Sequence, residues 1–124
     1  MSTLDVTKLK SKSSGTPTEF VDSGDVEVGQ LCKAWVNFNG VGTVAIRDSF
    51  NVSSITDNGT GVYSVNFANA MNDANYSAVA SLNYPSGGTD ARVLPVSVSQ
   101  LTIYTATAGS AVDPAVVCVA VFGS

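Results

Sequence analysis

An alternation of apolar and polar residues runs through the chain from residue 31 onward, and it restricts the fold more than any other feature. In residues 31–39 one face of a strand would carry Cys32, Ala34, Val36 and Phe38, because successive side chains of a strand point to opposite sides. The same period of two returns in residues 43–47, 49–55, 63–67, 76–84, 93–99 and 101–108, and residues 115–122 form a further apolar strand, without any helical period. This pattern predicts an all-β fold, an antiparallel β-sandwich of about seven or eight strands.

The glycines of residues 39–42 (NGVG) raise the question of a phosphate-binding loop. A dinucleotide-binding loop needs a GxGxxG pattern and a following helix, whereas residues 43–46 are β-branched strand material. Asn39-Gly40 fits a turn that requires positive φ, and Gly42 adds further freedom. The sequence therefore predicts a β-hairpin here.

Three local features refine the strand prediction. Phe50 and Val52 are expected to share one face, and Ile55 shifts the alternation, which indicates a β-bulge after Ser54. Pro95 lacks the N–H group that a ladder needs, and it indicates an edge strand or a bulge.

The last strand, residues 115–122 (AVVCVAVF), has no polar face. Such a strand is either central in the sandwich or covered by another subunit. The second alternative would place Val117, Val119 and Val121 in a subunit interface.

Trp35 stands among polar neighbours, on the face opposite Val36 and Phe38. A large ring on a polar face usually packs against protein, so we expect Trp35 under the N-terminal arm or in a subunit interface. A stacking platform for a sugar is the alternative. Cys32 and Cys118 are either two small buried thiols or a disulfide joining the first and last core strands.

The composition narrows the function. Only 13% of the 124 residues are charged, against 44% hydrophobic, and Ser, Thr, Asn and Gly are plentiful, which is typical of extracellular or virion β-proteins. The formal net charge of −4 disfavours nucleic acid and anionic lipid as partners. No run approaches the roughly 20 apolar residues of a transmembrane helix, and no secretory signal opens the chain. We expect neither a nucleic-acid partner nor membrane insertion.

The sequence contains no histidine, which removes the commonest general base and metal ligand. The acidic residues lie in predicted turns, where carboxylates commonly accept hydrogen bonds from their own backbone. We therefore expect no enzymatic activity, no cofactor and no metal site. A pair of acids for glycoside hydrolysis stays open as an alternative, although no spacing singles one out.

Residues 1–30 differ from the rest and are predicted to form an extended N-terminal arm that precedes a sandwich domain of residues 31–124. Lysines come first and acidic residues follow, which is consistent with a solvated, charge-segregated segment. We favour an attachment segment that orders against a partner or a sister chain, because its apolar side chains would otherwise be uncovered. The residues expected to dock are Leu4, Val6, Leu9, Phe20 and Val21.

A module near the C-terminus of tail-fibre proteins of tailed bacteriophages, notably cyanophages, closely resembles residues 32–79, CKAWVNFNGVGTVAIRDSFNVSSITDNGTGVYSVNFANAMNDANYSAV. The shared pattern is AWVNFNG-x-GT-x-x-IR-x-SFNVSSITDNG-x-G-x-Y-x-VNF-x-x-AM-x-x-x-NY. The opening TLDVTKLKSKSSGTPTEF is similar to the short segment that precedes this module. The resemblance implies a virion structural protein, a homotrimeric fibre without enzymatic activity. It carries over no catalytic or ligand residues, because the motif consists of strand and turn positions.

Family members are often longer than this chain, so the resemblance leaves the kind of fibre open. The expected protein is a short tail fibre made in the host cytoplasm, whose arm docks on the tail or baseplate and whose sandwich faces a host surface polysaccharide. A capsid-attached head fibre or decoration protein is the alternative, and a glycan-cleaving enzyme is the third. Candidate receptor-binding loops carry Asp57, Asn58, Gly59, Gly87, Gly88 and Asp90, because glycine-rich hairpin ends project from a sandwich.

Overall fold

The computed structural model describes residue 3, residues 19–85 and residues 87–123. The chain forms two compact units, residues 1–30 and residues 31–124. The described residues contain strands and no helix, so the all-β prediction is confirmed.

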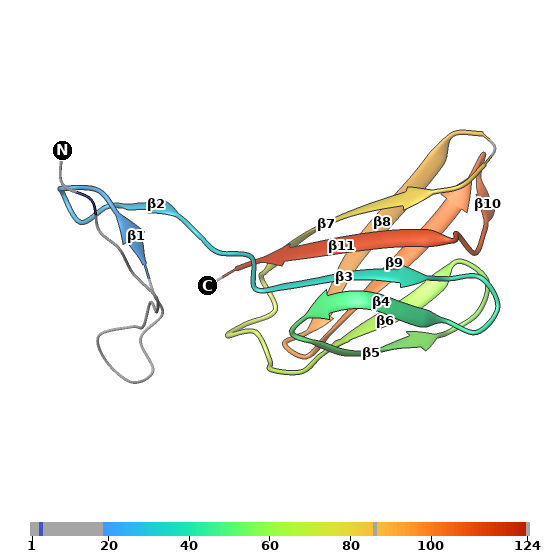
Figure 1. The fold of residues 1–124 in the computed structure, drawn as a ribbon, viewed down its shortest axis with the longest axis horizontal. Coiled ribbons are helices and arrows are strands. Elements are labelled where there is room, and N and C mark those ends of the chain that lie inside the picture. The colour runs from blue at the N-terminus through green and yellow to red at the C-terminus, as the bar shows by residue number, and fades with distance from the viewer. Residues whose placement is uncertain (1–2, 4–18, 86, 124) are drawn as a thin grey trace. The chain divides into compact units, whose positions relative to one another are not determined.

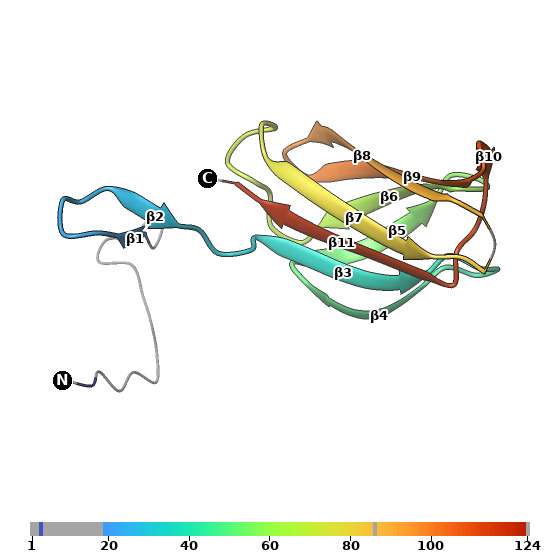
Figure 2. The same ribbon diagram turned by 90° about the horizontal axis from the view of Figure 1, so that it is seen from above.

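The larger unit is a sandwich of two antiparallel sheets, which Figure 1 shows one in front of the other and Figure 2 shows from above. The first sheet has the order β4-β3-β11-β7, formed by Ala45–Phe50, Ala34–Asn39, Val116–Phe122 and Ser77–Asn83. The second has the order β10-β9-β6-β5, formed by Ser110–Ala111, Gln100–Thr107, Val62–Phe67 and Val52–Asp57. β8 (Thr89–Ser97) also pairs with β9.

The core lies between the two sheets and is built by the inward side chains of the alternating strands. Phe38 and Tyr63 meet across the sheets in an edge-to-face contact, with ring centroids 5.2 Å apart. A second edge-to-face pair joins Phe67 to Tyr76 at 5.6 Å. The buried apolar residues are Ala34, Val36, Phe38, Tyr63, Val65, Phe67, Met71, Tyr76, Leu101, Ile103, Val117, Val119 and Val121.

Of the two alternatives for the last strand, the structure shows the central position, because β11 lies between β3 and β7. Pro95 likewise lies as predicted: β8 pairs with β9 alone among the described strands, and its register shifts between Pro95 and Ser97. Proline is tolerated in such a strand because the missing N–H group interrupts no continuous ladder.

The hairpin predicted at residues 39–42 is confirmed, but the reason for one glycine is different. Gly42 has positive φ (63°), whereas Gly40 does not. A Cβ atom on Gly40 would lie 2.5 Å from the Tyr63 hydroxyl oxygen and 3.0 Å from the Pro114 carbonyl oxygen. Gly40 is therefore required by close packing rather than by its backbone angle.

The prediction that Phe50 and Val52 share a face is wrong. Asn51 has a φ of 55° and stands where the chain leaves the first sheet for the second. Its side-chain amide donates to the carbonyls of Lys33 and Asn69, each at 3.1 Å, which fixes this corner. The bulge lies at residue 53, between Val52 and Ser54, one position before the predicted site.

The smaller unit contains a short antiparallel hairpin, β1 (Phe20–Val21) and β2 (Glu27–Gly29). Its turn is held by Asp22, whose Oδ1 accepts hydrogen bonds from the N–H groups of Gly24 (2.8 Å) and Val26 (3.1 Å). This part of the predicted extended arm is a hairpin.

Candidate functional site

The outer face of the first sheet carries a row of apolar side chains that crosses all four strands. In the strand register, Trp35 on β3 lies opposite Phe50 on β4 and opposite Ala120 on β11, and Ala120 lies opposite Val79 on β7. Trp35 is 38% exposed, Phe50 54% and Val79 59%, although all three are large apolar residues. Together they form what we call the apolar row: Phe50, Trp35, Ala120 and Val79.

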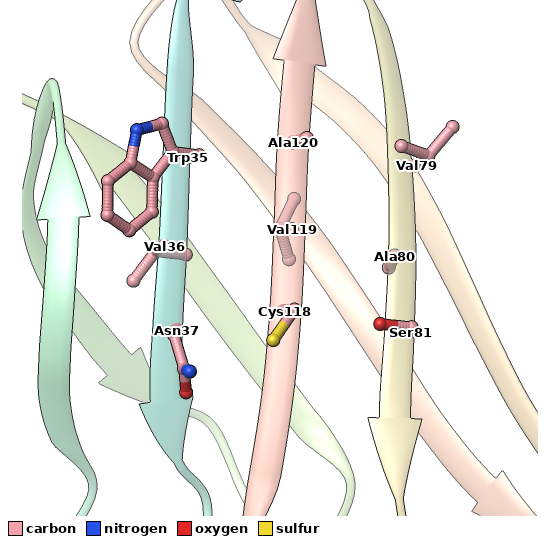
Figure 3. A pocket seen from close by; sticks show the side chains of 9 residues that line it. All are labelled: Trp35, Val36, Asn37, Val79, Ala80, Ser81, Cys118, Val119 and Ala120. Carbon is pink, nitrogen blue, oxygen red and sulfur yellow. The ribbon is translucent and has the colours of Figure 1, made fainter.

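The row becomes a groove because the central strand carries small side chains. Ala120 and Cys118 of β11 lie between Trp35 on one side and Val79 on the other, as Figure 3 shows. The resulting hollow measures about 440 Å³. Cross-strand neighbours on one face lie close together, so these side chains form one continuous apolar surface.

The neighbouring row on this face is more polar. Cys118 lies opposite Asn37 on one side and Ser81 on the other, and Asn37 lies opposite Asp48. The Arg47 guanidinium donates to Asn37 Oδ1 at 3.2 Å and to the carbonyl of Ala115 at 2.6 Å. The groove therefore combines an apolar floor with amide and hydroxyl groups along one edge, which suits contact with another protein surface.

The outer face of the second sheet is polar around Asn66, whereas β8 carries two exposed apolar side chains, Leu94 (52%) and Val96 (51%). The Asn66 side chain donates to Ser54 Oγ at 3.1 Å and to Thr56 Oγ1 at 3.0 Å, and it accepts from Gln100 Nε2 at 2.7 Å. The side chains of this network are hydrogen-bonded to one another within the sheet. Water can complete their remaining bonds, so the polar part of this face needs no protein partner.

Three residues predicted for a subunit interface lie elsewhere. Val117, Val119 and Val121 are at most 3% exposed and belong to the core between the sheets. A side chain already covered within its own chain offers no surface to a second one, so these three are withdrawn from the interface. Trp35 remains on the outer face, where a partner can reach it.

Sequence reasoning missed Phe50 and Val79. The sequence did contain a signal for Val79: like Trp35, this large apolar residue lies on an otherwise polar face of its strand. Phe50 carried no such signal, since its orientation depends on the corner at Asn51.

The described residues of the candidate loops at residues 57–61 and 85–90 lie at the same end of the sandwich (Figure 1), opposite the end where β3 begins. In the first loop, Asp57 Oδ1 accepts from the N–H group of Gly59 at 3.0 Å. Asn58 Nδ2 donates to Ser64 Oγ at 2.8 Å. These side chains shape the turn, as Asx residues commonly do.

In the second loop, Gly87 has a φ of 78° and the Gly88 carbonyl accepts from the N–H group of Ala108 at 3.0 Å. Asp90 forms an exposed ion pair with Arg92 at 3.2 Å. The described residues of the two loops thus present backbone and short polar groups.

The two cysteines do not pair. Cys118 lies opposite Asn37 in the register, five positions along the chain from Cys32, which corresponds to about 16 Å of strand. A disulfide needs Cα atoms within about 7 Å, so both residues are free thiols.

Of the residues predicted to dock through the arm, Phe20 and Val21 form β1 and are both exposed. Leu4, Val6 and Leu9 lie outside the described residues. Within the part of the chain that the structure describes, no cluster of His, Cys, Asp or Glu could hold a metal ion. The same residues include no helix long and apolar enough to cross a membrane.

Comparison with protein-family models, with curated proteins and with solved structures finds no match to this chain.

Proposed function

We propose that this chain is a virion structural protein, a short tail fibre that assembles as a homotrimer. The apolar row on the outer face of the first sheet carries the proposal, because three large apolar side chains in register are costly to leave in water. The resemblance of residues 32–79 to the tail-fibre module of tailed bacteriophages supports the same assignment. A homotrimer would cover the row of each subunit with the surface of the next.

In this proposal the two ends of the sandwich have different roles. The N-terminal arm joins the sandwich at the end where β3 begins, and it docks on the tail or baseplate. The hairpin turns at the opposite end face the host surface, where three copies of a weak polysaccharide site gain avidity. A capsid-attached head fibre or decoration protein uses the same arm and the same face, and antibody labelling of virions distinguishes head from tail.

The first test is the solution mass of the full chain by light scattering, compared with two variants. Trp35→Lys places a charge in the apolar row, and we expect it to weaken association roughly thirtyfold or more. Tyr104→Lys is the matched control, since Tyr104 is similarly exposed (37%) but lies on the second sheet. It should leave the mass unchanged.

A wild-type mass of three chains that falls to one chain only for Trp35→Lys supports the proposal. A wild-type chain that stays monomeric at high concentration refutes the trimer, and equal effects of the two variants refute the role of the apolar row. Far-UV circular dichroism establishes that both variants remain folded.

A further inference from the structure

The hairpin of β1 and β2 exposes more apolar surface than it can sustain alone. Two paired strands of two and three residues are well below what is stable in water without a further layer or strand. Each of its large apolar side chains is between 39% and 65% exposed, namely Phe20, Val21, Val26 and Val28. The Asp22 hydrogen bonds fix the turn, so the hairpin is shaped in advance for a partner that covers it.

The charge of the hairpin indicates what that partner is. Residues 19–31 contain four acidic residues and no lysine or arginine: Glu19, Asp22, Asp25 and Glu27. The sandwich, residues 32–124, contains five aspartates against three basic residues, so a sandwich surface would repel the hairpin overall. The complementary charge lies in residues 1–18, which contain three lysines (Lys8, Lys10 and Lys12) and a single acidic residue, Asp5.

We propose that residues 3–12 of one chain dock on the β1–β2 hairpin of a second copy. This inference rests on the homo-oligomer proposed above and names the contact that its arms make. The segment alternates in the manner of a strand at Leu4 and Val6, so it can add to a free edge of the hairpin. Its lysines then lie near the acidic side chains, and its apolar side chains cover those of the hairpin.

We expect the segment to dock on a second copy rather than on the hairpin of its own chain, because the hairpin has more uncovered surfaces than one segment can cover. One added strand satisfies one edge of the hairpin but leaves an apolar face of the small sheet in water. Hairpins and segments from several copies can enclose a shared apolar interior. The uncharged residues 13–18 (SSGTPT) span up to about 20 Å, so the lysine segment need not dock on the hairpin that follows it in its own chain.

The test reverses each set of charges in the full chain. The first variant is Lys8→Glu/Lys10→Glu/Lys12→Glu, and the second is Glu19→Lys/Glu27→Lys. Asp22 and Asp25 are kept, since Asp22 holds the turn and Asp25 has positive φ (60°). The third variant combines both sets, and Asp90→Lys is the control for a charge change on the sandwich.

The readout is the dissociation constant of the assembly, measured by light scattering across a dilution series in 0.15 M salt. Each single set should weaken association about tenfold or more, because several charge pairs are lost and like charges meet. The combined variant should return to within about threefold of wild type, and Asp90→Lys should have no effect. In about 1 M salt the differences between variants should largely disappear.

Mixing the two single-set variants, one of them tagged, distinguishes contacts between chains from contacts within a chain. The lysine segment of the second variant can dock on the intact acidic hairpin of the first, so the two should assemble together and purify together. If the combined variant is restored but the mixture is not, the contact lies within one chain and the proposal is wrong.

The outcome also separates this proposal from the proposed function. If both charge reversals associate like wild type while Trp35→Lys dissociates, the arm contact is refuted and the sandwich interface stands. If the charge reversals act and Trp35→Lys does not, the arm contact stands and the apolar row loses its role. A monomeric wild-type chain refutes both.

Discussion

Replacing Tyr63 by phenylalanine should destabilise the sandwich at neutral pH and have almost no effect at about pH 11.5. The Tyr63 ring is fully buried, and its hydroxyl donates to Asp113 Oδ1 at 2.7 Å and lies 3.1 Å from the Gly40 carbonyl oxygen. The N–H group of Gly61 also donates to Asp113 Oδ1, at 2.8 Å. These bonds join three turns at one end of the sandwich.

The magnitude at neutral pH follows from the hydrogen bond to a charged acceptor. Phenylalanine keeps the edge-to-face contact with Phe38 but leaves Asp113 and the Gly40 carbonyl without their shared donor. Losing such a bond costs about 2 kcal/mol of unfolding free energy. The difference in unfolding free energy between wild type and variant should be constant between about pH 6 and pH 9, because Tyr63 ionises there in neither the folded nor the unfolded protein.

Alkali removes the difference. Burial raises the pKa of Tyr63 well above its ordinary value of 10, and the hydrogen bond to Asp113 and the negative charge of Asp113 raise it further. Above pH 10 the unfolded tyrosine releases its proton while the folded one keeps it, so wild-type stability falls by about 1.4 kcal/mol per pH unit from this group. The phenylalanine variant lacks this loss, and the two unfolding free energies should meet about 1.5 units above pH 10.

Urea unfolding followed by far-UV circular dichroism, at intervals from pH 6 to pH 11.5, measures both quantities. A difference of about 2 kcal/mol that closes in alkali supports the argument. A difference that stays constant to pH 11.5 would refute it, because Tyr63 would then ionise equally in the folded and unfolded states.

Two further predictions concern the first sheet. Gly40→Ala should destabilise the fold by about 2–3 kcal/mol, because the added Cβ overlaps the Tyr63 hydroxyl. Gly42→Ala should cost only about 1–2 kcal/mol, since nothing lies within 4 Å of its Cβ and only the positive φ is strained. Equal losses of unfolding free energy in urea would contradict the packing argument. Cys118 should react slowly with a thiol reagent in the wild-type assembly and at least about tenfold faster in Trp35→Lys, and equal rates would show that the groove is open in both.

The strands, and the face that most of them bury, could be predicted from the sequence, because a period of two can be recognised without knowing any distant contact. The core residues of β3 and β6 follow directly from it. The apolar strand β11 indicated that both of its faces are covered, although the sequence could not separate burial in the core from burial by a subunit. That choice depends on how the two sheets face each other, which no local pattern records.

The parts that the sequence did not predict depend on positions where the chain changes direction. Asn51 turns the chain from one sheet to the other, and its positive φ reverses the alternation so that Phe50 points outward. Gly40 reads as a turn residue, yet it is required by a tyrosine that comes 23 positions later. Both features arise from contacts between segments far apart in the sequence, and neither has a local signature.

The contrast between the apolar row and the polar network around Asn66 limits how copies of this chain can associate. Burying that network would remove water from its amide and hydroxyl groups, and any of these groups left unpaired would cost about 1–3 kcal/mol. Covering the apolar row instead removes Trp35, Phe50 and Val79 from water without comparable loss. An assembly should therefore turn the first sheet of each copy inward and leave the polar part of the second sheet facing solvent. The charged residues near the apolar row support this direction, because Arg47 and Asp48 lie on the edge strand β4, where they can remain hydrated at the rim of an interface.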